Sequence, residues 1–431
     1  MAFGGTGATR PRTRGGATTD PATLSDRERR QALHALLALT FLSWGGFYLV
    51  VPLISVHYVE QLGWAAGAVG VVLAARQFAQ QGTTLFSGIV ADRVGAKRLI
   101  AGGMLVRSAG FAMMAFAGTY PLLLGSAVLA ALGGGLFDSP KSAAIAALAR
   151  PEERPRFYAQ AGVAAGLGMT VGTQLGALLL RADFAAVSLA GAAVYIGMFL
   201  LVLRFVPPVR VADERADPLA GIRGALRDRP FTTYVGLDSG LWFMNTQFFI
   251  TLPLAATAIA GTPEAVAWVF AVNSLVTVLL AYPVPRAVGR HLPPIEALVL
   301  GFALTALGLL GIGLSTGTPM LLAMTFLFSL GTVLARPNEQ TVTAGLANPA
   351  ALGSYFGVAA LSVAFGGGLG SIAGGTLYDV GTRLGHPVLP WAVCAAVGLL
   401  AAAGLLVTTV PHLTGRRVPR WTSREVEEKG V

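Results

Sequence analysis

Apolar and polar residues alternate in long blocks along the chain. After residue 32, stretches of about 20 mostly apolar residues follow one another, with short polar segments between them. A helix needs about 20 such residues to cross a hydrocarbon core of roughly 30 Å. The pattern therefore predicts twelve transmembrane helices, near residues 33–56, 67–90, 99–118, 121–140, 158–180, 185–206, 232–258, 265–285, 295–315, 319–337, 355–377 and 390–411.

The polar segments divide these stretches into two groups of six. The charged segment 207–231 is predicted to be a cytoplasmic linker between an N-terminal half, 33–206, and a C-terminal half, 232–411. Residues 1–32 are rich in Gly, Thr, Arg and Pro and lack an apolar core, which predicts a disordered tail and not a signal peptide. Residues 412–431 form a second predicted tail.

Composition supports a membrane protein built from helices. Hydrophobic residues make up 54% of the 431 residues and charged residues only 12%, about half the usual share in soluble proteins. The only cysteine, Cys394, lies in an apolar run, so we expect neither an intramolecular disulfide nor a metal site. The five histidines are scattered and no H-E-x-x-H, G-x-S-x-G or P-loop motif occurs, so we do not expect an enzyme.

The basic residues predict the orientation. If the N-terminus is cytoplasmic, 27 of the 31 Lys and Arg residues lie in the tails and on the cytoplasmic side, and only Arg181 and Arg383 lie outside. The positive-inside rule then places both termini in the cytoplasm, and abundant Ala and Gly suggest a bacterial inner membrane. The net charge of +10 is spread over many loops, which indicates topology and contact with anionic lipids, not nucleic-acid binding.

The two halves repeat each other in sequence with an offset of 198 residues. The stretch from Leu132 resembles the stretch from Leu330, and the glycines of the fifth helix recur in the eleventh, as Gly168/Gly366, Gly172/Gly370 and Gly176/Gly374. Such glycines permit close helix contact, either in a packed core or at an interface that rocks. Two repeated six-helix halves are typical of transporters whose substrate site lies between the halves near the middle of the membrane.

Two motifs give the repeat a family resemblance. The loop after the second helix, "GIVADRVGAKRLI", resembles motif A of the major facilitator superfamily, with matches at Gly88, Asp92, Arg93, Gly95 and Lys97. On the fifth helix, "GMTVGTQLGA" resembles the antiporter motif C, with matches at Gly168, Gly172 and Gly176 but Thr173 where the motif has proline. Motif B is missing, because Leu129 stands at the place of its arginine.

After the tail, essentially the whole chain is similar to the drug:proton antiporter group of this superfamily, through stretches such as "RQFAQQG" and "GGLFDSP". The resemblance implies the all-α major facilitator fold and proton-coupled efflux of hydrophobic, drug-like small molecules by alternating access. It also implies a monomer that needs no cofactor beyond the proton gradient. The alternative is an uptake or metabolite transporter of the same fold.

The resemblance implies a gating role for motif A. Asp92 falls where the family's carboxylate meets the N-terminus of the eleventh helix, which we expect near Gly353 to Phe356. Free N–H groups and the helix dipole favour a carboxylate there. That contact would hold the cytoplasmic ends of the halves together. In the alternative interpretation, Asp92, Arg93 and Lys97 only set the topology.

Polar residues inside the predicted spans are further candidates. Arg76, Gln77, Gln80 and Gln81 share one helical face, and an arginine at membrane depth should face the bundle interior or a watery cavity. They form either a substrate or coupling surface or a polar packing network. Arg107, on the third helix, is a similar candidate.

Carboxylates inside the spans are candidates for the proton carrier. Asp238 is the most deeply placed of them, so we rank it first, and we rank Asp138 second. By the repeat, Asp138 corresponds to Arg336 and Lys141 to Glu339. These four residues could form two ion pairs across the central axis, or each could pair within its own half.

Overall fold

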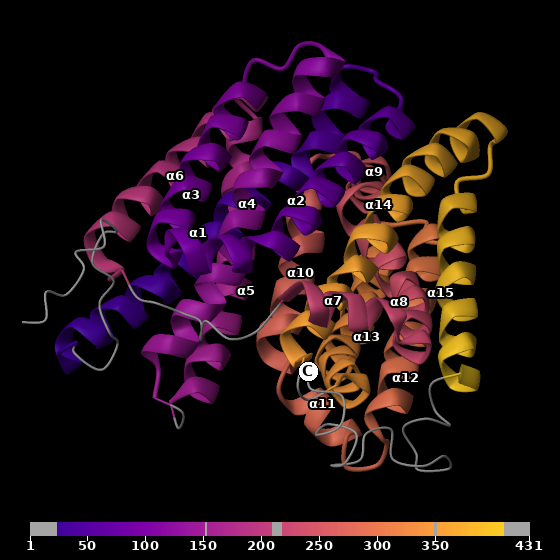
Figure 1. Ribbon diagram of the computed structural model, residues 1–431. Coiled ribbons are helices and arrows are strands. Elements are labelled where there is room, and N and C mark those ends of the chain that lie inside the picture. Colours follow the sequence, from indigo (N-terminus) through magenta and orange to yellow (C-terminus); the bar gives the residue numbers. More distant parts are fainter. Residues whose placement is uncertain (1–23, 151–152, 209–217, 349–350, 409–431) are drawn as a thin grey trace, which may run out of the picture.

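The computed structural model describes residues 24–150, 153–208, 218–348 and 351–408, and the regular elements in these ranges are helices. The N-terminal half contains α1 (Asp26–Ser55), the π-helix η2 (Val56–Gln61), α2 (Ala66–Val94), α3 (Ala96–Met114), α4 (Tyr120–Leu148), α5 (Arg154–Leu180) and α6 (Phe184–Phe205). The C-terminal half contains α7 (Pro218–Arg227), α8 (Arg229–Asn245), the 3-10 helix η3 (Thr246–Phe249), α9 (Thr251–Ala260), α10 (Glu264–Leu280), α11 (Pro283–Val288), α12 (Pro294–Gly313), α13 (Thr318–Leu346), α14 (Leu352–Leu384) and α15 (Leu389–Thr408). The two halves lie side by side, indigo to magenta and orange to yellow in Figure 1.

Each of the twelve predicted spans coincides with a helix or a broken helix. Within the described ranges, eight helices are long and apolar enough to cross a membrane, and α8 with η3 and α9 forms a ninth span bent by 40°. The other three spans are α2, which carries Arg76 and three glutamines, α3, and the 17-residue α10. The chain is therefore an all-α, multi-pass membrane protein with two six-helix halves.

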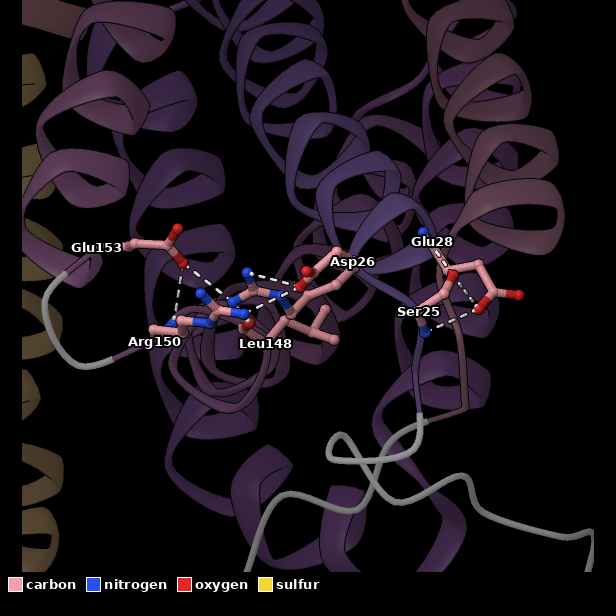
Figure 2. A network of polar contacts seen from close by, with 7 residues as sticks. Ser25, Asp26, Glu28, Leu148, Arg150 and Glu153 are labelled. Atoms are coloured by element: carbon pink, nitrogen blue, oxygen red, sulfur yellow. Dashed lines mark hydrogen bonds and ion pairs between the residues drawn. The ribbon is translucent and has the colours of Figure 1, made fainter.

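The two ends of the bundle differ in what they carry. We call the end with α7 and the start of α1 the linker end, and the end with the loops after η2 and after α9 the opposite end. At the linker end, the predicted N-terminal tail, residues 1–32, is too long, because α1 already begins at Asp26. Ser25 and Glu28 form a capping box, in which the Glu28 N–H donates to Ser25 Oγ and the Ser25 N–H donates to Glu28 Oε2 (Figure 2). The expectation of disorder is wrong for residues 26–32, while residues 1–23 lie outside the described ranges.

An ionic network fixes the start of α1 to the loop after α4. The buried guanidinium of Arg29 donates to Glu153 Oε2 at 3.0 Å and lies 3.5 Å from Asp26 Oδ1. Arg150 pairs with Asp26 at 3.0 Å (Figure 2). These contacts join α1, the end of α4 and the residue before α5 within the N-terminal half.

Close helix packing inside each half follows the sequence repeat. A Cβ added to Gly172 of α5 would lie 2.1 Å from the Gly45 carbonyl oxygen of α1, and a Cβ added to Gly370 of α14 would lie 2.6 Å from the Phe243 carbonyl oxygen of α8. Both members of the second pair are displaced by 198 residues from the first. The flanking motif glycines behave alike, Gly168 and Gly176 against Phe41 and Leu49, and Gly366 and Gly374 against Ser239 and Gln247. The repeated glycines therefore allow close packing of two helices within each half, and their close contacts described above do not cross the interface between the halves.

The halves meet along two helix pairs, α2 with α14 and α5 with α10. Across the first pair, a Cβ on Gly70 would lie 2.4 Å from the Ser371 carbonyl oxygen, so the backbones approach closely. Across the second, Gln174 Nε2 donates to the Ala267 carbonyl oxygen at 3.2 Å. These pairs frame the centre of the bundle, where the polar candidates lie.

Candidate functional site

Motif A forms the turn between α2 and α3. Gly95 has φ +93°, a conformation that favours glycine, which explains the residue at this position. Lys97 Nζ donates at 2.9 Å to the Leu203 carbonyl oxygen near the end of α6, where a cation suits the helix dipole. α14 begins at Leu352, next to the start expected from the sequence. Gly88, Asp92 and Arg93 lie in α2, but their side-chain surroundings are outside what the structure describes, so the gate stays a prediction.

A polar cluster lies on the face of α2 that turns toward the bundle interior. Arg76 donates from Nη1 to Gln80 Oε1 at 3.0 Å and from Nη2 to Gln77 Oε1 at 2.9 Å. Gln77 Nε2 in turn lies 3.5 Å from the Val363 carbonyl oxygen of α14, in the other half. Gln81 is half-buried on the same helix. The predicted group therefore lies at the interface between the halves, with Arg76 held by two glutamines.

Arg107 of α3 lies close to this cluster, because it contacts the same Phe47 ring as Arg76 does. Its side chain is buried, and its Cζ lies 5.6 Å from the centroid of the Phe47 ring and 4.9 Å from that of Tyr195. Arg76 Cζ lies 5.2 Å from the same Phe47 ring. A small cavity beside them is lined by both arginines and by apolar side chains that include Phe47, Phe111 and Met114.

The C-terminal half holds an acidic cluster. Asp238 of α8 is buried and lies beside Glu339 of α13 and Ser362 of α14. Trp242 Nε1 donates to Glu339 Oε1 at 3.4 Å, and Arg336 stacks over the Trp242 ring at 4.1 Å. Among the described residues, Asp238 Oδ1 has no hydrogen-bond partner. Of these groups, Arg107 in the N-terminal half and Asp238 in the C-terminal half are the buried ones.

Two of the four charge-swapped residues of α4 and α13, Arg336 and Glu339, pair within their own half in the contacts described. Arg336 Nη1 lies 3.8 Å from Glu339 Oε2 on the same helix. A spacing of three residues puts both on one helical face, so this pairing needs no movement of the halves. Lys141 Nζ lies over the Phe137 ring of its own helix at 4.8 Å. The side chain of Asp138 lies outside what the structure describes.

Aromatic rings that the sequence analysis did not single out connect the halves. The Phe47 and Tyr48 rings of α1 lie 5.9 and 5.6 Å from the Phe249 ring of η3, and Tyr48 lies 5.6 Å from Phe270 of α10. Trp44 stacks on Tyr48 from one turn away. The spacing of Trp44, Phe47 and Tyr48 could have predicted a shared aromatic face, because residues three and four apart lie on the same side of a helix. These rings form an apolar wall beside the arginine cluster.

A carboxylate contact at the opposite end was also missed. Asp379 of α14 accepts hydrogen bonds from the backbone N–H groups of Ala66, at 3.0 Å, and Gly67, at 2.8 Å. Ala66 and Gly67 open α2, so the carboxylate satisfies N–H groups that have no partner within the helix. The contact joins the two halves at the end away from motif A.

The comparisons with known proteins agree with this architecture. The sequence profile of the Major Facilitator Superfamily matches residues 36–263 and 235–429. The chain is 40% identical over 375 residues to the multidrug resistance protein MdtH of Edwardsiella ictaluri (strain 93-146), covering 87% of this chain and 93% of the relative. It is 41% identical over 360 residues to the protein of the same name from Sodalis glossinidius (strain morsitans), covering 84% of this chain and 89% of the relative.

Solved structures share the fold at much lower sequence identity. The peptide transporter POT in complex with sulfate superposes with a TM-score of 0.73 at 17% identity, covering 88% of this chain and 94% of that one. The nucleoside transporter NupG gives 0.73 at 14% identity, covering 88% and 99%. The repeated halves, the motif A turn and the full-length relatives lead to one conclusion. The chain belongs to the Major Facilitator Superfamily of membrane transporters.

Proposed function

We propose that this transporter exports hydrophobic, drug-like molecules by proton-coupled alternating access. The linker end and both termini would face the cytoplasm of a bacterial cell. The names of the relatives support multidrug efflux, because MdtH proteins at about 40% identity span most of the chain. The aromatic wall around Phe47, Tyr48 and Phe249 suits apolar, flat substrates.

One observation supports alternating access most directly. The described hydrogen bonds and ion pairs between the halves lie from the middle of the bundle to the opposite end. They include Ser55 with Phe249, Ala66 and Gly67 with Asp379, and Arg181 with Glu264, the last at 2.8 Å. A transporter held at one end in this way admits substrate from the other. Exchange of these contacts for the predicted contact of Asp92 with the start of α14 would reverse the accessible side.

The acidic cluster offers a means of proton coupling. The buried Asp238 and the half-buried Glu339 lie side by side, and two such carboxylates can hold one proton between them. Arg336, 3.8 Å from Glu339, is placed to stabilise the negative charge once that proton leaves. We therefore keep Asp238 as the first candidate for the proton carrier, with Glu339 as its partner and Asp138 as the second candidate.

Proteoliposomes test the coupling. A panel of hydrophobic dyes is offered with and without an imposed pH gradient, to the wild type, Asp238→Asn and Asp138→Asn. We expect Asp238→Asn to abolish gradient-driven accumulation but to allow passive exchange. Asp183→Asn, an exposed carboxylate at the opposite end, is the matched control and should behave as wild type. Survival of pH-driven accumulation in both Asp238→Asn and Asp138→Asn would mean that the proton is carried elsewhere.

The direction of transport and the topology need their own measurement. Cysteines added near Arg215, in a Cys394→Ala background, should resist an impermeant thiol reagent in intact cells. Labelling there from outside would contradict the proposed orientation. Accumulation of dye on the acidic side of oriented vesicles supports export, whereas movement of dye together with protons would favour the alternative, an uptake or metabolite transporter of this fold.

A further inference from the structure

Two guanidinium groups of the N-terminal half, that of the buried Arg107 and that of the half-buried Arg76, lie around one aromatic ring. Arg76 Cζ and Arg107 Cζ are 5.2 and 5.6 Å from the centroid of Phe47, and only 4% of Arg107 is exposed. Room for the Arg107 guanidinium is made by a glycine, because a Cβ on Gly134 would lie 2.3 Å from Arg107 Nη1. Two like charges are thus held close together, and that of Arg107 lies away from water.

These charges are not balanced by the side chains described around them. Arg76 donates to the neutral amides of Gln77 and Gln80, and Arg107 contacts the rings of Phe47 and Tyr195. In the described ranges, Arg107 has neither an ion pair nor a hydrogen bond, and the Nε atoms of both arginines are buried without a partner. An unpaired buried charge is unfavourable in a low-dielectric interior, so a bound anion would stabilise this arrangement.

We propose that Arg76 and Arg107, beside the small cavity between them, form an anion subsite that binds the acidic group of an aromatic substrate. The cavity is lined by both arginines together with Phe47, Phe111 and Met114. A carboxylate or sulfonate there would accept charge-assisted hydrogen bonds from the free guanidinium N–H groups. The aromatic body of the same molecule would lie against Phe47, whose ring also contacts Phe249 of the other half. The substrate class is therefore an amphipathic aromatic anion or zwitterion.

The claim that this ligand is transported rests on the proposed function, whereas its binding does not. Equilibrium binding to protein in lipid nanodiscs therefore separates the two. Two fluorescent probes differ by one sulfonate group, which 1-anilinonaphthalene-8-sulfonate carries and N-phenyl-1-naphthylamine lacks. If the sulfonate probe binds through the arginines but proteoliposomes transport nothing, the subsite stands and the proposed function fails.

We expect Arg107→Gln to weaken binding of the sulfonate probe by roughly 10- to 100-fold, the range for losing a charge-assisted hydrogen bond. Binding of the neutral probe should stay within about twofold, which also shows that the variant is folded. Arg107→Lys keeps the charge and should fall between wild type and Arg107→Gln. Arg204→Gln, which removes an exposed arginine near the linker end of α6, is the control and should bind both probes as wild type does.

Two outcomes would overturn the proposal. If Arg107→Gln weakened the binding of both probes equally, Arg107 would contribute only to packing. If it left the binding of the sulfonate probe unchanged, the anion would bind elsewhere. Competition separates the possible sources of the anion. Non-fluorescent 1-naphthalenesulfonate should displace the probe, and inorganic sulfate at the same concentration should not. Equal displacement by sulfate would show a site for small inorganic anions and contradict the aromatic substrate class.

Discussion

The hydroxyl of Ser55, at the end of α1, donates a hydrogen bond of 2.9 Å to the carbonyl oxygen of Phe249 in the other half. In a regular α-helix, the N–H of residue 253 would bond to the carbonyl of residue 249, but Pro253 has no N–H. The seventh span bends by 40° at this break, between η3 and α9. A proline in one half thus frees a carbonyl group that a serine of the other half uses, so the halves are joined through a break in a helix.

Ser55→Ala should loosen the opposite end of the bundle. The substitution leaves the Phe249 carbonyl without its partner and removes a contact worth about 0.5–1.5 kcal/mol. We expect a shift toward states in which the opposite end is open. Spin labels on cysteines at positions 118 and 386, exposed sites at that end of the two halves, measure it as a longer distance, in a Cys394→Ala background.

The matched control is Ser126→Ala. Ser126 is also buried, and its hydroxyl donates to the Leu123 carbonyl of its own helix, so it joins nothing across the halves. The distance distribution of this control should match that of the wild type. A distribution that Ser55→Ala leaves unchanged would show that this hydrogen bond does not hold the halves together.

Asp379→Ala should open the same end by another route. The carboxylate accepts from the N–H groups of Ala66 and Gly67, and a charge at a helix N-terminus contributes about 0.3–2 kcal/mol. Asp379 lies on α14 and accepts hydrogen bonds at the N-terminus of α2. Motif A predicts the reciprocal contact at the linker end, with Asp92 of α2 at the N-terminus of α14. Loss of Asp379 should therefore increase the labelled distance and slow transport, with expression maintained.

Asp183→Ala is the control for charge at this end. Asp183 precedes α6, is exposed and makes no side-chain cap to the helix. It should change neither distance nor transport. If Asp379→Ala and Asp183→Ala behave alike, the contact of Asp379 with α2 is incidental to the transport cycle.

The sequence predicts the spans well because about 20 apolar residues in a row indicate a helix that crosses the membrane. It does not predict which helices touch, because α12 and α15 are apolar on all sides and so carry little signal about the face that packs. The repeat predicted that helices five and eleven behave alike, but only the structure shows Gly172 against Gly45 in one half and Gly370 against Phe243 in the other. The partners of Asp379 and Ser55 are backbone groups more than 190 residues away, and no side-chain pattern marks them.

Gly172→Ala should destabilise the N-terminal half. The new Cβ would lie 2.1 Å from the Gly45 carbonyl oxygen and 2.8 Å from its carbonyl carbon, and backbone atoms cannot move aside without separating α1 from α5. Overpacking of this kind costs about 1–3 kcal/mol. Thermal unfolding of the purified protein in detergent should show a lower midpoint.

Gly197→Ala provides the comparison on a neighbouring helix. A Cβ there meets nothing within 4 Å, and alanine favours the helix more than glycine does, so stability should hold or rise slightly. Equal unfolding midpoints for Gly172→Ala and wild type would mean that α5 can move away from α1 at little cost. In that case the motif glycines would need another explanation, such as a moving contact.

The network at the start of α1 should make the linker end sensitive to acid. Burial alone would raise the pKa of Glu153, but the Arg150 N–H and the charges of Arg29 and Arg150 outweigh it and lower the pKa below its usual value (Figure 2). Because the pKa is lower in the folded protein than in the unfolded chain, the contact stabilises the fold above the unfolded value of about 4.3. That contribution is lost as the pH falls through the folded value.

Glu153→Gln should therefore lower the unfolding midpoint by a constant amount between about pH 5.5 and pH 8, and the difference from wild type should shrink below about pH 4.5. Arg29 is the residue that forms an ion pair with Glu153, since its Nη1 lies 3.0 Å from Glu153 Oε2. In an Arg29→Gln background, Glu153→Gln should consequently have a smaller effect at neutral pH, as a double-mutant cycle measures. The pairing of Arg29 with Glu153 would be ruled out as the cause if the two substitutions were strictly additive, or if the difference grew as the pH was lowered.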